Sequence, residues 1–126
     1  MRPSLSPGDY LVAVATTSPR RGDIVVFPDP ERPDRDLVKR VIGLPGEMVT
    51  IDGGQVAVDG AILAEPWADG PTLPDDEWRL PDQTVFVLGD NRRISSGDGR
   101  SIGPLRVDNM FRVVFRYWPL GSLGTL

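Results

Sequence analysis

A lysine stands inside an apolar stretch of the sequence. Residues 36–47 read DLVKRVIGLPGE, in which Lys39 and Arg40 interrupt a run of aliphatic and β-branched residues that closes at a Pro-Gly turn. On a strand, Lys39 points with Leu37 and Val41 while Arg40 points to the opposite face, so the simplest interpretation is that one of these cations, such as Lys39, faces water. The alternative is a lysine in apolar surroundings, where the loss of solvation lowers its pKa and the neutral amine becomes a general base.

A second stretch whose side chains could do chemistry is GDNRRISSGDGRSIGP, residues 89–104. It gathers hydroxyl, carboxylate, amide and guanidinium groups directly after an apolar strand, where side chains are held rigidly against a core. The same residues also suit a polar surface hairpin with Asx turns and an exposed ion pair, and the chemistry alone leaves both interpretations open. The polar residues are Asp90, Asn91, Arg92, Ser95, Ser96, Asp98, Arg100 and Ser101.

The composition narrows the chemistry. The 126 residues contain no histidine and no cysteine, which excludes a Ser-His-Asp triad, disulfides, zinc–thiolate sites and cysteine nucleophiles, and disfavours any transition-metal site. Acid–base catalysis near neutral pH must then use a carboxylate, a lysine or a tyrosine with a shifted pKa. The net charge is −4 without a basic cluster, so nucleic acid is not expected as a partner.

The elements that position these groups are predicted to be strands. Thirteen prolines and fourteen glycines leave little room for helices, and tight Asp-Gly turns separate the apolar runs. We predict one mostly β domain over residues 1–126, an antiparallel meander with long loops and little helix. The predicted strands are 9–15, 23–27, 37–43, 48–51, 55–58, 84–88 and 110–118. The acidic, proline-rich segments 28–35 and 65–81 are predicted as surface loops, the second anchored by Trp67 and Trp78 and without a catalytic group.

Four segments, in this order, resemble the conserved boxes of type I signal peptidases, which are serine endopeptidases with a Ser/Lys dyad. They are MRPSLSPGD (1–9), RRGDIVVF (20–27), VKRVIGLPGE (38–47) and FVLGDNRRISSGDGRSIGP (86–104). The combination of VKR-x-x-G-x-PG with GDNR…S-x-D-x-R is the specific part. The resemblance implies the antiparallel β-fold that signal peptidases share with LexA-like proteins, no cofactor or metal, and signal peptides of exported preproteins as substrates.

The resemblance also implies roles for single residues. Lys39 matches the general base of the family, and Ser96 matches the serine that orients the lysine amine. One residue more than usual separates GDNR from S-x-D, so Ser95 could take the role given to Ser96. Asp98 and Arg100 match a supporting ion pair. The GDNR turn falls on Asp90, Asn91 and Arg92, and the shallow apolar pockets for small substrate side chains fall on Met1, Pro3 and Leu5.

The first box departs from the family pattern. The family reads S-M-x-P-[TS]-L there, with the nucleophilic serine directly before the methionine, whereas this sequence starts at Met1. Ser4 matches a position that the family does not use for attack. We therefore expect the nucleophile and an upstream membrane anchor to be missing, and the chain as given to be soluble and inactive. The full-length form is expected in the cell membrane, with its catalytic domain on the extracytoplasmic side.

Two other classes of protein share part of the pattern. Self-cleaving repressors resembling LexA have a G-D-[IV]-V-V strand and a later VKR with a catalytic lysine, but they lack the GDNR…S-x-D-x-R block and carry an Ala-Gly cleavage site and a DNA-binding domain. A catalytically inactive relative, which binds peptides or a partner without cutting, stays open because of the missing serine. The joint presence of Lys39, Ser96, Asp98 and Arg100 favours the enzyme.

Overall fold

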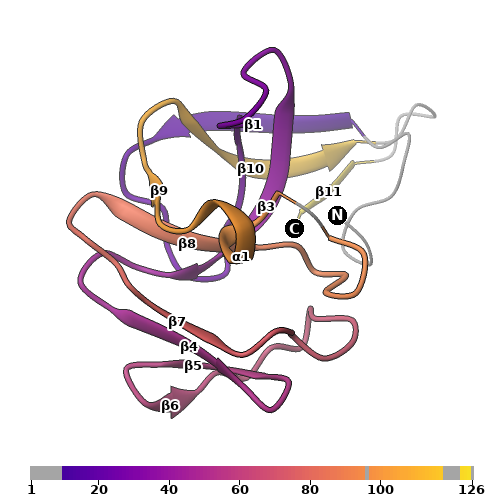
Figure 1. Cartoon of the computed structure of the whole chain (residues 1–126). Coiled ribbons are helices and arrows are strands. Elements are labelled where there is room, and N and C mark those ends of the chain that lie inside the picture. Colours follow the sequence, from indigo (N-terminus) through magenta and orange to yellow (C-terminus); the bar gives the residue numbers. More distant parts are fainter. Residues whose placement is uncertain (1–9, 96, 118–122, 126) are drawn as a thin grey trace.

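Two antiparallel sheets make up the described part of the chain, which covers residues 10–95, 97–117 and 123–125 of a computed structural model. The larger sheet has the strand order β1-β10-β2-β3-β8-β9, with β11 paired to β10, and the smaller has the order β6-β5-β4-β7. The elements are β1 (Tyr10–Thr16), β2 (Ile24–Pro28), β3 (Asp36–Gly43), β4 (Met48–Asp52), β5 (Gln55–Val58), β6 (Ala61–Ile62), β7 (Asp76–Arg79), β8 (Thr84–Leu88), α1 (Gly99–Ile102), β9 (Leu105–Arg106), β10 (Met110–Tyr117) and β11 (Leu123–Thr125). In Figure 1 the larger sheet lies above the smaller one and α1 lies in front, close to β8.

Strands β3 and β8 lie between two hydrophobic cores, because successive side chains of a strand point to opposite faces. Ile42, Phe86 and Leu88 pack with residues of the smaller sheet in a core between the two sheets, which we call the inter-sheet core. The neighbouring residues on the same strands, such as Val41 and Val87, pack in a second core on the other face of the larger sheet. All five residues of β8 are therefore buried.

Gly43 ends β3 where the chain leaves the larger sheet for the smaller one. A Cβ atom at this position would lie 2.5 Å from Val49 Cγ2 and 2.7 Å from Leu80 Cδ1. The pairing of β3 with β8 also shifts register between Val41 and Gly43. Only glycine fits this crossing without moving the inter-sheet core.

The predicted mostly β, antiparallel fold is confirmed, with two corrections. The strands do not form a simple meander, because β10 inserts between β1 and β2 in the larger sheet. The segment 65–81 is not a loop throughout: its residues Asp76–Arg79 form β7, which pairs with β4. Trp67 and Trp78 pack against the inter-sheet core, as predicted for the anchors of this segment. Trp118, at the end of the last predicted strand, lies outside the described residues.

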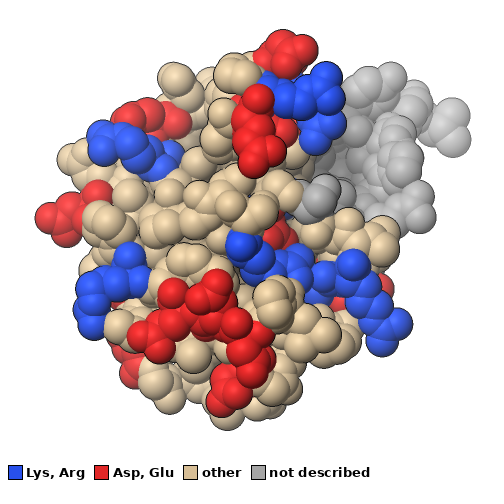
Figure 2. Space-filling view, viewed as in Figure 1, with Lys and Arg blue, Asp and Glu red and all other residues tan. Residues whose placement is uncertain are grey.

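The surface carries both signs of charge. On the face shown in Figure 2, basic side chains lie across the middle of the molecule and acidic ones gather below them, over the smaller sheet. The four-residue α1 is the only helix among the described residues, so no helix in that part of the chain is long and apolar enough to cross a membrane.

Candidate active site

Lys39 is buried in the middle of β3. It pairs with Val25 of β2 and is only 8% exposed, while Val25 and Val41 on the same face have no exposed surface. The interpretation of Lys39 as a cation facing water is therefore wrong. Burial lowers the pKa of Lys39 below its ordinary value of 10.5; the nearby Asp98 carboxylate opposes this shift, whereas the positive charge of Arg100 adds to it.

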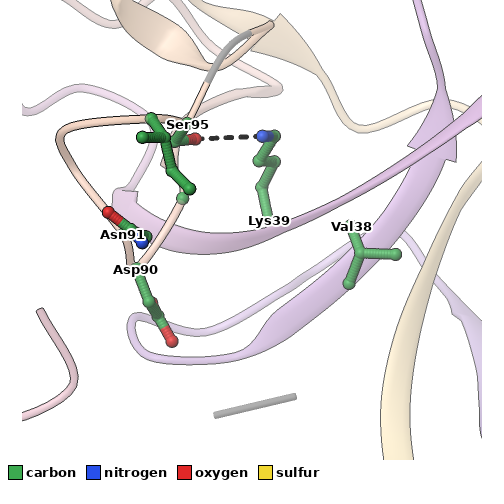
Figure 3. Close-up of a pocket in the computed structure, with 7 residues that line it drawn as sticks. Val38, Lys39, Asp90, Asn91 and Ser95 are labelled. Atoms are coloured by element: carbon green, nitrogen blue, oxygen red, sulfur yellow. Dashed lines mark hydrogen bonds between the residues drawn. The ribbon is translucent and has the colours of Figure 1, made fainter. Parts of the chain in front are cut away.

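The lysine amine lies within hydrogen-bond distance of a serine hydroxyl. Lys39 Nζ donates to Ser95 Oγ at 3.0 Å, and Ser95 Oγ donates in turn to Asp98 Oδ2 at 3.1 Å. Figure 3 shows the side chains of Lys39 and Ser95 pointing toward one another, from β3 and from the loop after β8. Ser96 lies outside the described residues, so the contact that the structure describes is the one to the alternative serine, Ser95.

Asp98 organises the loop around this contact. Its side chain caps α1 by accepting from the Arg100 backbone N–H at 3.1 Å, and it accepts from the Gly89 N–H at 3.3 Å. The predicted ion pair with Arg100 is present at 2.8 Å. Burial alone would raise the pKa of Asp98, but the hydrogen bonds and charge of Arg100 outweigh it and hold the pKa below its ordinary value. Asp98 is therefore a carboxylate near neutral pH.

Arg40 points to the face of β3 opposite Lys39, as expected from the period of a strand. Its guanidinium group makes two hydrogen bonds to the Asp90 carboxylate, at 3.0 and 2.9 Å, and lies 4.8 Å from the centre of the Trp67 ring. The side chain of Asp90 is fully buried. In Figure 3 Asp90 points away from Lys39. This pair fixes the start of the polar loop against β3.

Gly89 leaves the space that the serine occupies. A Cβ atom on Gly89 would lie 1.9 Å from Ser95 Oγ and 3.5 Å from Lys39 Nζ. No L side chain fits there without displacing the hydroxyl group. The glycine of the GDNR block is thus required by the contact between Lys39 and Ser95, a requirement that the sequence pattern did not reveal.

An open pocket of about 260 Å³ lies at the lysine. Its wall combines aliphatic residues with the lysine, the serine and further residues of the loop. The lining residues are Val38, Lys39, Gly89, Asp90, Asn91, Ile94 and Ser95. Met1, Pro3 and Leu5, which the sequence placed in substrate pockets, lie outside the described residues.

Two features of the site escaped the sequence prediction. Arg92 does not reach Lys39: it is buried against Glu65 and Thr72, both from the segment expected to be a surface loop. The other feature is that Lys39 is the only lysine among the 126 residues, which the sequence shows but the prediction did not use. Every other basic side chain is an arginine, which stays protonated, so Lys39 is the one basic side chain that can act as a neutral amine.

The arrangement is suited to proton transfer. A buried amine with a lowered pKa, held by a hydroxyl at the wall of an open pocket, can accept a proton from a group that enters the pocket. Among the described residues no cluster of acidic side chains is arranged to hold a metal ion.

Comparison with known proteins agrees with this fold. The profile of the family described as "Signal peptidase, peptidase S26" matches residues 1–118. Signal peptidase I of Leptolyngbya laminosa is 38% identical over all of this chain and 68% of its own length, and signal peptidase I of Bacillus caldolyticus is 34% identical over 94% and 75%. The crystal structure of a signal peptidase I from Enterococcus faecalis superposes with a TM-score of 0.67 at 29% identity, over 76% of this chain and 96% of that one. The chain belongs to the signal peptidase family, the S26 peptidases, and within it is similar to the signal peptidase I type.

Proposed function

We propose that this protein removes signal peptides from exported preproteins by acyl transfer, with Lys39 as the general base of a Ser/Lys dyad. The observation that carries the proposal is the only lysine of the chain, buried and 3.0 Å from Ser95 Oγ at the wall of the pocket. Relatives named signal peptidase I and thylakoidal processing peptidase 1, the latter from Arabidopsis thaliana and 33% identical, support the substrate class.

The hydrogen bond between Lys39 and Ser95 has a defined direction. A neutral amine has two N–H donors and one acceptor lone pair. The hydroxyl hydrogen of Ser95 goes to Asp98, so Ser95 Oγ accepts an N–H from Lys39 and does not occupy the lone pair. Ser95 thus orients the amine by accepting one of its N–H groups.

The proposed reaction has two proton transfers in each half. The serine hydroxyl attacks the scissile carbonyl as Lys39 takes its proton, and backbone N–H groups stabilise the oxyanion. The lysine ammonium then gives that proton to the leaving amine, and an acyl-enzyme remains. Water, deprotonated by Lys39, attacks the ester, and the proton returns to the serine oxygen. Substrate adds as an extended strand, with small side chains in the pockets.

We propose that the nucleophile in the complete protein is a serine directly before Met1. The support is the first sequence box, in which the family places the serine before that methionine. Upstream of it we place the membrane anchor, which would hold the catalytic domain on the extracytoplasmic side.

The test compares the printed chain with a version that carries one additional serine before Met1. Only the extended protein is expected to cleave a fluorogenic peptide with small residues before the scissile bond. Lys39→Met in the extended protein should reduce kcat/KM by about 10³-fold or more while circular dichroism shows an intact fold.

The matched control carries alanine instead of serine before Met1 and should be as inactive as the printed chain. An active Lys39→Met protein would exclude Lys39 as the base. If the serine-extended protein bound the peptide without cleaving it, the chain would be a peptide-binding relative rather than an enzyme.

A further inference from the structure

Arg92 is a buried cation that does not take part in the proposed proton transfer. It is 2% exposed and its guanidinium group makes four hydrogen bonds. Nη1 and Nη2 donate to the two carboxylate oxygens of Glu65 at 3.2 and 2.7 Å, and Nη1 also donates to Thr72 Oγ1 at 2.7 Å. Nε donates to the carbonyl oxygen of Gly89 at 2.7 Å. One end of this cluster therefore lies at the glycine that contacts Ser95.

The segment 65–73 is joined to the polar loop by further bonds along its length. The backbone N–H of Asp69 donates to the Asp90 carbonyl at 2.7 Å, and the Arg92 N–H donates to the Asp69 carbonyl at 3.0 Å. Arg100 Nη1 donates to the carbonyl oxygens of Leu73 and Arg92 at 2.9 and 3.0 Å. These bonds attach the segment to the loop that carries Ser95 and Asp98.

Glu65 also contacts Trp67, whose ring lies against the second buried ion pair of the site. Its Oε2 accepts from Trp67 Nε1 at 3.3 Å, and the Trp67 ring lies under the Arg40 guanidinium group that binds Asp90. The Glu65 carboxylate thus contacts both Trp67, which packs against Arg40 of β3, and Arg92, which bonds Gly89 of the polar loop. With a side chain 10% exposed, Glu65 compensates a fully buried Arg92 side chain that could not otherwise stay where it is.

We propose that Glu65 is a positioning residue for the lysine base: by holding Arg92, it fixes the Gly89 peptide and thereby keeps Ser95 Oγ against Lys39 Nζ. Gly89 can transmit this effect because Ser95 Oγ occupies the place where a Cβ of Gly89 would lie, so the two residues are close neighbours. The kinetic part of this inference rests on the proposed function, while the structural part does not.

The structural part is tested on the printed chain by following the single lysine. Selective ¹³Cε-lysine labelling gives one side-chain NMR signal, whose pH titration reports the pKa of Lys39. Thr72→Val removes one acceptor of Arg92 without a change of charge, so the loosened loop should admit water to the amine and move the pKa of Lys39 upward, toward 10.5. Glu65→Gln should change the same signal, although the uncompensated charge of Arg92 then opposes the upward shift.

The matched control is Glu47→Gln. Glu47 forms a partly buried ion pair with Arg21 at 2.7 Å, the same distance as between Glu65 and Arg92, and it accepts a hydrogen bond from the Leu44 N–H. Neutralising Glu47 therefore removes the same kind of interaction as neutralising Glu65. The Glu47→Gln variant should lower the melting temperature and leave the Lys39 titration unchanged. If Thr72→Val and Glu65→Gln behave like this control, Glu65 only stabilises the fold and the proposal is overturned. Thr72→Val also keeps the test decisive if Glu65→Gln does not fold.

The kinetic part uses the serine-extended protein. Glu65→Gln should reduce kcat/KM by about tenfold, mainly through kcat, as for other residues that orient a catalytic group. In a double-mutant cycle, Glu65→Gln should cost little more in a protein that already carries Ser95→Ala, because the contact it maintains is gone. Independent, multiplicative losses would contradict the proposal. If the parent extended protein does not cleave peptides at all, the proposed function fails, while the lysine titration still decides the role of Glu65.

Discussion

Lys39 carries a cost to folding that depends on pH. Its pKa is lower in the folded protein than in the unfolded chain, so the unfolded state binds more protons between the two values. Stability therefore rises with pH across that window, and below it the full cost of burying the amine is present. A residue retained at such a cost is typical of a catalytic site.

Lys39→Met should accordingly be more stable than the parent chain at neutral pH, and this advantage should shrink toward pH 10.5. The shrinkage is limited to about 1.4 kcal/mol per pH unit, the slope for one proton. Urea unfolding of both proteins at pH 7, 8.5 and 10 measures the difference, in which the titrations of other groups cancel. A difference that is constant across this range would mean that Lys39 is not desolvated in the folded protein.

Residue types and the family resemblance together pointed to the chemical groups of the candidate site but not to all their contacts. The strand pattern alone left two interpretations of Lys39 open, and the resemblance to signal peptidases singled out Lys39 and the Asp98–Arg100 pair, which the structure contains. The choice between Ser95 and Ser96 depends on how the loop turns between Gly89 and Asp98, which neighbouring serines do not reveal. Glu65 is 27 residues from Arg92, and contacts of that range leave no local pattern.

Among the elements, β3 is the one whose shape most restricts its sequence. Gly43→Ala places a methyl group against Val49 and Leu80 and should destabilise the protein by about 1–3 kcal/mol, the usual cost of overpacking. Adding Val49→Ala removes one of the two clashing atoms, so the double variant should lose less than the sum of the single losses. Chemical denaturation of the four proteins measures this coupling. Strict additivity would show that the inter-sheet core does not press on Gly43.

Strands were predicted well where apolar residues alternate or run together, and poorly where pairing alone makes the strand. The central strands β3, β5 and β8 were found within about one residue because burial dictates their composition. β7 reads DEWR and was missed, since its edge position beside β4 leaves most of its side chains exposed. The insertion of β10 between β1 and β2 was missed because periodicity gives strands but not their order.

At the scale of the whole molecule, the two sheets should unfold together. The inter-sheet core and the second core are filled from opposite faces of the same strands, β3 and β8, so neither sheet can lose its partner independently. Trp118→Phe leaves Trp67 and Trp78, both packed on the inter-sheet core, as the only tryptophans. Their fluorescence and far-UV circular dichroism should give the same urea midpoint. An earlier fluorescence transition would show that the smaller sheet is a separate folding unit.

The single lysine has a consequence for the reactivity of the chain toward electrophiles. The sequence offers no thiol and no imidazole, and an ordinary lysine is protonated and unreactive near neutral pH. The buried amine of Lys39 is the one side-chain amine, its lowered pKa favours the free base, and it opens onto a pocket with aliphatic walls. A small apolar aldehyde or activated ester should therefore react at the Lys39 amine, with the α-amino group as the main competing site. The mass of the intact protein would give the number of modified amines.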